Sequence, residues 1–174
     1  MTISAEQLKK DVAHGLAIEL DDAIDCIQHC VGQLSESQVW MRPNDAMNSV
    51  GNLLLHVCGN IRQWIIAGVG GVPDTRKRQA EFDERGPIAK SELLRQLIGV
   101  VEEAKRTIEF SLPERWAQPL TVQGFSVTGA AALIHSVAHL RGHTQEIVHM
   151  TRTLVGDRYQ FKFVPTTPEQ GATT

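Results

Sequence analysis

Apolar residues recur at intervals of three and four along four long segments of the chain, which is the spacing of one face of an α-helix. The first segment runs from about Ser4 to Gln33, and Gln7 lies three residues after Ser4, as in an N-terminal capping box. Its periodic apolar residues are Leu8, Val12, Leu16, Leu20, Ala23, Ile27 and Leu34. Pro43 then prevents a simple continuation of this helix.

Three further helices are expected, over residues 49–67, 91–112 and 128–156. Ser49 and Ser91 are suitable N-caps for the second and third helices. Glycines and a proline in GVGGVPD stop the second helix, and Pro113 closes the third. The fourth helix opens at Thr128 or Gly129 and ends near residue 156.

The connection over residues 68–90 is long, charged and without a period of its own, and connections of this kind are often functional or mobile. It holds one basic run, RKR at 76–78, which is surrounded by the acidic residues Asp74, Glu81, Asp83 and Glu84. We interpret this run as part of a solvated loop. Farther on, LTVQGFSV at 120–127 could pair briefly as a hairpin.

Four helices of this length in 174 residues predict an all-α fold, an antiparallel four-helix bundle in which the two longer connections allow a crossover. The chain length suits one domain with a sizeable core. The bundle is expected to span residues 1–156. Residues 157–174 are rich in Pro, Thr and Gly, and we expect them to form an extended tail.

Composition excludes several classes of function. The net charge of −3 gives no basic surface for nucleic acid, and no segment reaches the roughly 18 uncharged apolar residues of a membrane span. The N-terminus lacks the apolar run of a signal peptide. Cys26, Cys30 and Cys58 form no CxxC pair, and we interpret them as small buried thiols. These features predict a cytoplasmic protein without nucleic-acid or membrane partners.

The segment LIHSVAHLRGHTQEIVHM, residues 133–150, carries three histidines spaced four residues apart: His135, His139 and His143. Neighbours at this spacing have Cβ atoms about 6 Å apart, close enough for two imidazoles to bind one metal ion. His135 and His143 are separated by about 12 Å along the helix axis, so all three cannot easily share an ion. The metal-binding pair is therefore His135/His139 or His139/His143, and the spacing alone does not distinguish between them.

The second predicted helix has its own polar row, formed by Asn52, His56 and Asn60 at fourfold spacing opposite an apolar face. On spacing alone, this row is more typical of a face turned to water. The alternative is a polar pocket in which His56 faces the fourth helix and the asparagines orient ligands or substrate. Periodicity does not separate these two interpretations.

The motif NSVGNLLLHVCGN, followed far downstream by HLRGHTQEI, resembles the DinB-like proteins, a superfamily of metal-binding four-helix bundles. The segments WMRPNDAMNS and RKRQAEFDERGP also resemble an uncharacterised branch of this group, so the similarity extends from about Trp40 to the tail. The family pattern has one histidine on the second helix and an HxxxH pair on the fourth. Carried over residue by residue, it implies that His56, His139 and His143 are metal ligands.

The resemblance implies a divalent ion, nickel or zinc, held by three imidazoles with open positions for water. It places His135 outside the triad, in the second shell or the core. Glu146 follows His143 by three residues on the same face, where it could orient a ligand histidine or act as a general base. Asn52 and Asn60 are candidates for the surrounding pocket. Apart from Glu146, no catalytic residue is assigned.

Relatives include metal-dependent hydrolases and transferases that use mycothiol or bacillithiol as cosubstrate. The resemblance therefore implies a metal-dependent enzyme in which the ion activates a thiol or water. A non-catalytic protein that binds a metal and a small molecule is the alternative. A carboxylate-bridged di-metal bundle is set aside because it needs repeated Glu-x-x-His pairs, and the second helix has no acidic residue.

We also expect a homodimer that pairs through helix faces. Four-helix relatives often pair, and the first helix carries apolar residues around much of its girth: Ile18, Leu20, Ile24 and Ile27. The small-molecule substrate is left open.

Overall fold

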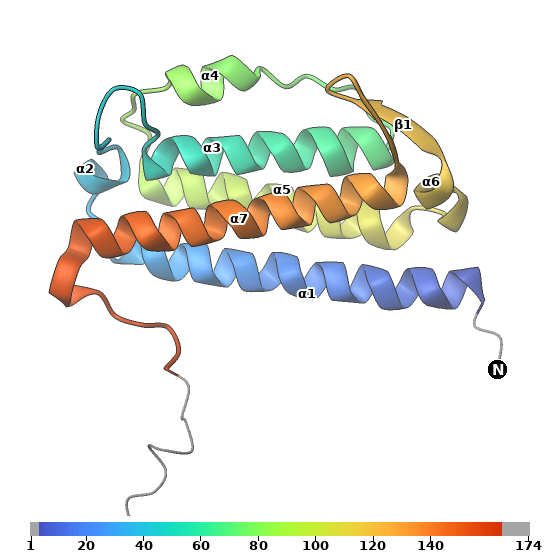
Figure 1. Ribbon diagram of the computed structural model, residues 1–174, viewed down its shortest axis with the longest axis horizontal. Coiled ribbons are helices and arrows are strands. Elements are labelled where there is room, and N and C mark those ends of the chain that lie inside the picture. Colours follow the sequence, from blue (N-terminus) through green and yellow to red (C-terminus); the bar gives the residue numbers. More distant parts are fainter. Residues whose placement is uncertain (1–3, 165–174) are drawn as a thin grey trace, which may run out of the picture.

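Four long helical segments lie lengthwise beside one another in the computed structural model (Figure 1), which describes residues 4–164. They are α1 (Ala5–Gly32), α3 (Val50–Ile61) with its π-helical continuation η1 (Arg62–Val69), α5 (Lys90–Phe110) and α7 (Gly129–Val155). The shorter elements are α2 (Glu36–Val39), α4 (Arg78–Asp83), α6 (Pro113–Ala117), β1 (Pro119–Val122), β2 (Phe125–Thr128) and η2 (Gly156–Arg158). The fold is thus mostly helical with one small sheet.

The long connection between η1 and α5 sets the directions of the helices. It travels back along the molecule through α4, so α3 and α5 run in the same direction, opposite to α1 and α7 (Figure 1). This is the crossover that the length of the 68–90 connection allowed. It also places α3 beside α7, which is the arrangement that the candidate site requires.

Helix boundaries follow the capping residues in three of the four cases. The side chains of Ser4, Ser49 and Thr128 accept hydrogen bonds from the first turns of α1, α3 and α7. The prediction that Ser91 caps the third helix is wrong, because α5 already begins at Lys90. The backbone N–H of Lys90 donates to the Glu36 carboxylate at 2.9 Å, so a side chain from α2 satisfies it.

The predicted hairpin is present between α6 and α7. β1 and β2 pair antiparallel, with Pro119 opposite Thr128 and Val122 opposite Phe125. Gln123 and Gly124 turn the chain with φ of 53° and 81°, as a two-residue hairpin turn requires. The prediction of an all-α antiparallel fold is therefore corrected: the fold is mostly helical with a two-stranded sheet, and the neighbouring helices α3 and α5 run parallel.

A single apolar core lies between the four long segments. Its largest fully buried side chains are Leu20, Ile27, Leu34, Leu53, Leu54, Ile61, Ile65, Leu93, Leu97, Ile108, Leu133 and Leu140. Among the residues named for a dimer interface, Leu20, Ile24 and Ile27 belong to this core, which leaves Ile18 on the surface. Apolar residues surround α1 because it packs against both α5 and α7.

None of the helices within residues 4–164 is long and apolar enough to cross a membrane. The predicted tail is described only in part. Gly156–Arg158 forms a short 3-10 turn, the chain continues to Val164 without regular structure, and residues 165–174 lie outside the described part.

Candidate metal centre

Two neighbouring helices bring three histidines together. His56 comes from α3, and His139 and His143 lie one turn apart on α7. The Nε2 atoms of His56 and His139 are 2.9 Å apart, and the His56 ring lies 5.1 Å from each of the other two rings. One ligand atom from each residue lies within 4.8 Å of the others, so the group could hold a metal ion.

The structure also decides between the two histidine pairs on α7. His143, rather than His135, lies with His139 around His56. His135 is exposed and stacks on Trp64 with ring centroids 4.1 Å apart, while its ring lies parallel to that of His139 at 5.8 Å. His135 thus borders the group without belonging to it.

The polar row on α3 is buried, contrary to the interpretation that spacing favoured. Asn52, His56 and Asn60 are at most 5% exposed. Asn60 accepts a hydrogen bond from the Ser136 hydroxyl of α7 at 2.9 Å, which joins the two helices one turn from the histidines. The row faces α7 and the 72–84 segment, so both flanks of α3 are covered.

Arg76 and Glu81, from the connection between η1 and α5, complete the surroundings of His56. Glu81 Oε2 lies 3.0 Å from His56 Nδ1. Arg76 donates to both carboxylate oxygens of Glu81, from Nε at 2.7 Å and from Nη2 at 2.8 Å. The Arg76 side chain is only 2% exposed. The prediction that RKR at 76–78 is a solvated run is therefore wrong for its first residue.

The residues around Arg76 and Glu81 are anchored to α3 by backbone contacts. Asn52 donates to the carbonyls of Glu81 and Glu84 at 2.8 and 3.0 Å. Arg42 donates to the Phe82 carbonyl at 2.9 Å and to the Asn52 amide oxygen at 2.7 Å. Asn52 therefore positions the segment that carries Glu81. Sequence reasoning missed this role because the partners are backbone atoms far along the chain.

Glu146 lies beside His143, as its spacing on α7 suggested. Its Oε2 atom is 2.8 Å from His143 Nδ1. The carboxylate can therefore accept the Nδ1–H of His143 and leave its Nε2 free. His56 and His143 thus each have a carboxylate at Nδ1, which is the usual outer partner of a metal-binding histidine.

Burial determines the charge of the group. Desolvation, with the neighbouring His143 and His56, lowers the pKa of His139 to about 4, so this imidazole is neutral at pH 7. Burial alone would raise the pKa of Glu81, but hydrogen bonds from Arg76 and His56 outweigh it and lower the pKa. The group thus combines a neutral imidazole with an ionised acceptor. Neutral imidazole nitrogen is the form that binds metals.

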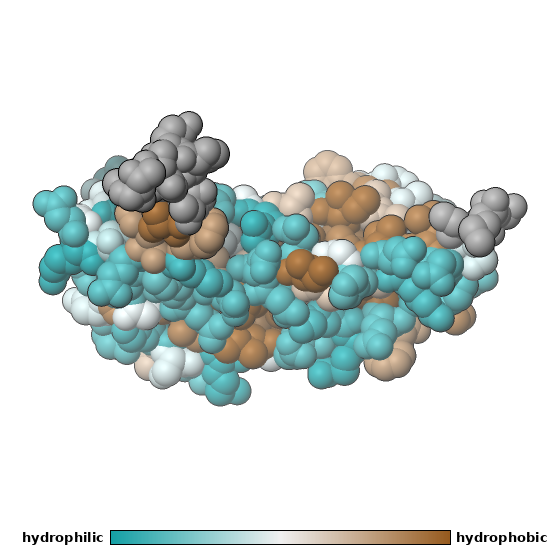
Figure 2. All heavy atoms as spheres, turned by 90° about the horizontal axis from the view of Figure 1, so that it is seen from below, coloured by the Kyte–Doolittle hydropathy of each residue, from teal (hydrophilic) through white to brown (hydrophobic). Residues whose placement is uncertain are grey.

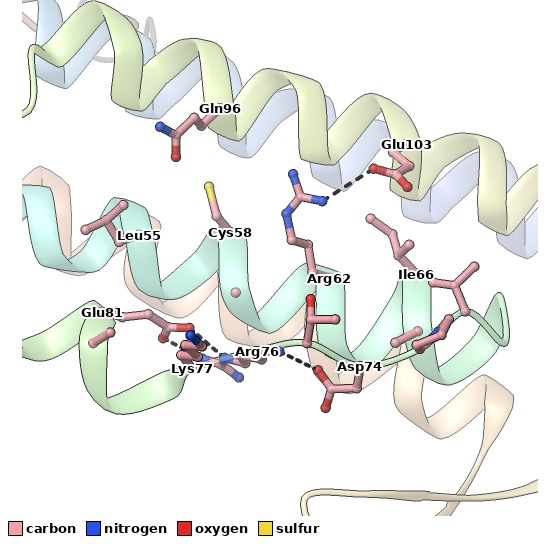
Figure 3. A pocket seen from close by; sticks show the side chains of 16 residues that line it. Leu55, Cys58, Arg62, Ile66, Asp74, Arg76, Lys77, Glu81, Gln96 and Glu103 are labelled. Atoms are coloured by element: carbon pink, nitrogen blue, oxygen red, sulfur yellow. Dashed lines mark hydrogen bonds and ion pairs between the residues drawn. The ribbon is translucent and has the colours of Figure 1, made fainter.

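Cys58 lies away from the histidines. It lines a cavity of about 400 Å³ between α3, α5 and the 72–81 segment, and its sulfur points from α3 toward α5 (Figure 3). Burial raises the pKa of this thiol to about 12, so it is not a thiolate at neutral pH. Cys58 is therefore not a candidate ligand of the group.

Three imidazoles, two of which have a carboxylate at Nδ1, suit a divalent ion such as nickel or zinc, which accept imidazole ligands. The candidate ligands are Nε2 of His56 and of His143, whose Nδ1 atoms face Glu81 and Glu146, and Nε2 of His139. Three protein ligands leave room in the coordination sphere for water or substrate, as in catalytic zinc sites. The donor set therefore fits the ion that the family resemblance implied.

Comparisons with known proteins agree with this architecture. A family model described as "Protein of unknown function (DUF1572)" matches residues 11–167. The crystal structure of a DinB-like protein from Bacillus subtilis, YjoA, superposes with a TM-score of 0.63 at 14% sequence identity, over 84% of this chain and 96% of that one. At this identity the similarity concerns the fold alone. No curated protein matches the chain.

Proposed function

The chain belongs to the DUF1572 family of proteins of unknown function, within the DinB-like superfamily, and we propose that it is a metal-dependent enzyme. His56, His139 and His143 would hold a divalent ion, nickel or zinc. The observation that carries this proposal is the convergence of three imidazoles from two helices within 4.8 Å, with a carboxylate behind two of them. His56 is buried and the other two histidines are half-buried.

When bound, a divalent ion at such a site lowers the pKa of a coordinated water or thiol, so that hydroxide or thiolate forms near neutral pH. Among the protein's own residues, Glu81 and Glu146 orient the ligand imidazoles through Nδ1. The ring of Phe82, on α4, packs 4.8 Å from that of His56. The exposed imidazole of His135 lies next to that of His139, with ring centroids 5.8 Å apart.

The reaction class we propose is the transfer of a thiol or of water to a small electrophilic substrate, that is, a thiol S-transferase or a hydrolase. The thiol has to come from a low-molecular-weight cosubstrate, because the thiol of Cys58 lies elsewhere and stays protonated. Glu146 is the candidate general base. It is exposed, and within residues 4–164 its hydrogen-bond partner is His143.

The test is a turnover assay of the metal-loaded protein with thiol cosubstrates and electrophiles, and with hydrolysable esters and amides. Activity that disappears after chelation and returns with nickel or zinc supports the proposal. Stoichiometric metal without turnover of any substrate class would instead favour the alternative, a non-catalytic protein that binds a metal and a small molecule.

We also propose a homodimer. An apolar groove lies between α1, α6 and α7 at one end of the molecule, and Leu8 and Ile134 along it are each 58% exposed. Phe161 and Phe163, 58% and 76% exposed, follow α7 at the other end. Figure 2 shows apolar side chains near both ends of one long edge. A twofold axis across this edge would bring the phenyl rings of one subunit to the groove of its partner.

A further inference from the structure

The Nδ1 atom of His56 has two polar neighbours that favour opposite tautomers of the ring. Glu81 Oε2 lies at 3.0 Å and can only accept a hydrogen bond. Arg76 Nη2 lies at 3.1 Å and can only donate. If Nδ1 carries the hydrogen, Nε2 has a free lone pair, whereas if Nδ1 accepts from Arg76, the hydrogen sits on Nε2. The identity of the true partner therefore decides whether His56 is ready to bind a metal.

The contacts of Arg76 favour Glu81 as the partner of His56. Besides its two bonds to Glu81, Arg76 donates from Nη1 to the Gln63 side chain at 2.9 Å and from Nη2 toward the His56 carbonyl at 3.4 Å. Both hydrogens on Nη2 thus have acceptors other than Nδ1, namely Glu81 Oε2 and the His56 carbonyl. A hydrogen on Nδ1 of His56, in contrast, has Glu81 as its acceptor, and a bond to a carboxylate is the stronger kind.

The Glu81 carboxylate is fixed in this position. Arg76 donates to both of its oxygens, and the side chains of Glu81 and Arg76 are 11% and 2% exposed, respectively. Figure 3 shows them close together on the side of α3 opposite Cys58. Gly59 provides the room, because a Cβ atom at this position would collide with Glu81 Oε1. A carboxylate held in this way cannot turn to become a metal ligand itself.

We propose that Glu81, held by Arg76, fixes His56 as the Nδ1–H tautomer, so that its Nε2 lone pair faces His139 before any metal arrives. The two residues are positioning residues, since they act through the imidazole. The 2.9 Å contact between the Nε2 atoms then has a defined polarity, in which His139 donates and His56 accepts. His139 is consequently the ligand whose Nε2–H must leave before that nitrogen can bind an ion.

The tautomer can be measured without metal, by long-range proton–nitrogen NMR correlations of the ring of His56 in the chelated protein. We expect the Nδ1–H pattern in the wild type. In Glu81→Gln, Arg76 needs the amide oxygen as acceptor, which leaves the amide NH₂ facing His56. Nδ1 then becomes an acceptor, and we expect the Nε2–H pattern. Asp83→Asn is the matched control, because Asp83 is also a carboxylate of α4 and bonds only to Gln79.

Calorimetric titration with Zn²⁺ measures the consequence, and this part rests on the proposed metal function. We expect the affinity of Glu81→Gln to fall at least about tenfold, as for other outer partners of metal-binding histidines, and that of Asp83→Asn to stay unchanged. An Nε2–H pattern in the wild type, or equal affinities of Glu81→Gln and wild type, would overturn the inference. Wild-type protein with the expected tautomer but no zinc binding would instead overturn the proposed function alone. The wild-type NMR result stands even if the variant does not fold.

Discussion

The Nε2 atoms of His56 and His139 lie 2.9 Å apart although 83 residues separate them in the chain. Two imidazole nitrogens at this distance either share one proton or face a common ion. His56 is buried and His139 half-buried, and each ring is carried by a long helix that packs around the core. The contact therefore marks the place where a metal held by both rings would bind.

We predict that His139→Ala abolishes stoichiometric nickel or zinc binding, because the other two imidazoles alone are too few ligands for a tight site. His135→Ala is the control, since His135 borders the group without joining it. Elemental analysis of the two purified variants beside the wild type measures this. Equal metal content in His139→Ala and wild type would refute the triad.

The second prediction concerns pH and begins with the metal-free protein. His139 has a folded pKa of about 4, below its unfolded value of about 6.5. Between these two pH values, the imidazole of His139 therefore binds a proton when the chain unfolds. The stability that its neutral form contributes is present above about pH 6.5 and is lost as the pH falls toward 4. A bound metal deepens this dependence, because protons compete for all three ligands.

We therefore expect chelation to lower the melting temperature of metal-loaded protein more at about pH 7.5 than at about pH 5, where protons compete with the ion for the imidazole ligands. Thermal unfolding at both pH values, with and without chelator, measures the difference. If metal retention is independent of pH over this range, imidazole ligation is wrong and carboxylates such as Glu146 become the better candidates.

Gly59→Ala should lower both stability and metal affinity. Helix propensity alone favours alanine over glycine by about 0.5–1 kcal/mol. The new Cβ, however, collides with Glu81 and Arg76, so it disrupts their buried ion pair, which costs more stability than the propensity returns, and it displaces Glu81 from His56, which weakens metal binding. Gly99→Ala on α5 is the matched control, since its Cβ would meet no atom within 4 Å. Urea unfolding and zinc titration of both variants measure the two effects. Unchanged zinc affinity in Gly59→Ala would contradict the steric argument.

Ser136→Ala should destabilise the fold by about 1–3 kcal/mol, because it removes the hydroxyl that donates to the buried amide oxygen of Asn60. Thr153→Ala deletes an exposed hydroxyl from the same helix, which bonds only to the His149 carbonyl, and should cost less than about 0.5 kcal/mol. Urea unfolding monitored by circular dichroism compares the two. Similar costs would mean that the bond between α3 and α7 contributes little.

For the proposed dimer, light scattering at micromolar concentration should give twice the chain mass. The double variant Leu8→Glu, Ile134→Glu places charges in the apolar groove and should yield monomers without loss of helix content. A matched variant is Ile18→Glu, an exposed position on α1 outside the residues that line the groove. A monomeric wild type would refute the proposed dimer.

Local signals in the sequence predict the helices and narrow the choice of candidate ligands. Apolar spacing and the caps at Ser4, Ser49 and Thr128 predict three helix starts, because these signals are local. The HxxxH spacing on α7 limited the candidate metal ligands of this helix to two pairs, His135/His139 and His139/His143. The family resemblance then selected His139 and His143 with His56, and this is the group that the tertiary structure brings together.

Which faces are buried, and which residues support the candidate ligands, depends on tertiary packing. The row of Asn52, His56 and Asn60 resembles a solvated face by spacing, yet α7 and the 72–84 segment cover it. Arg76 and Glu81 lie in a stretch without periodicity, and their importance arises from contacts across 20 and 25 residues. Spacing along one helix reports neighbours on that helix, whereas the partners of a buried polar group depend on how distant segments pack.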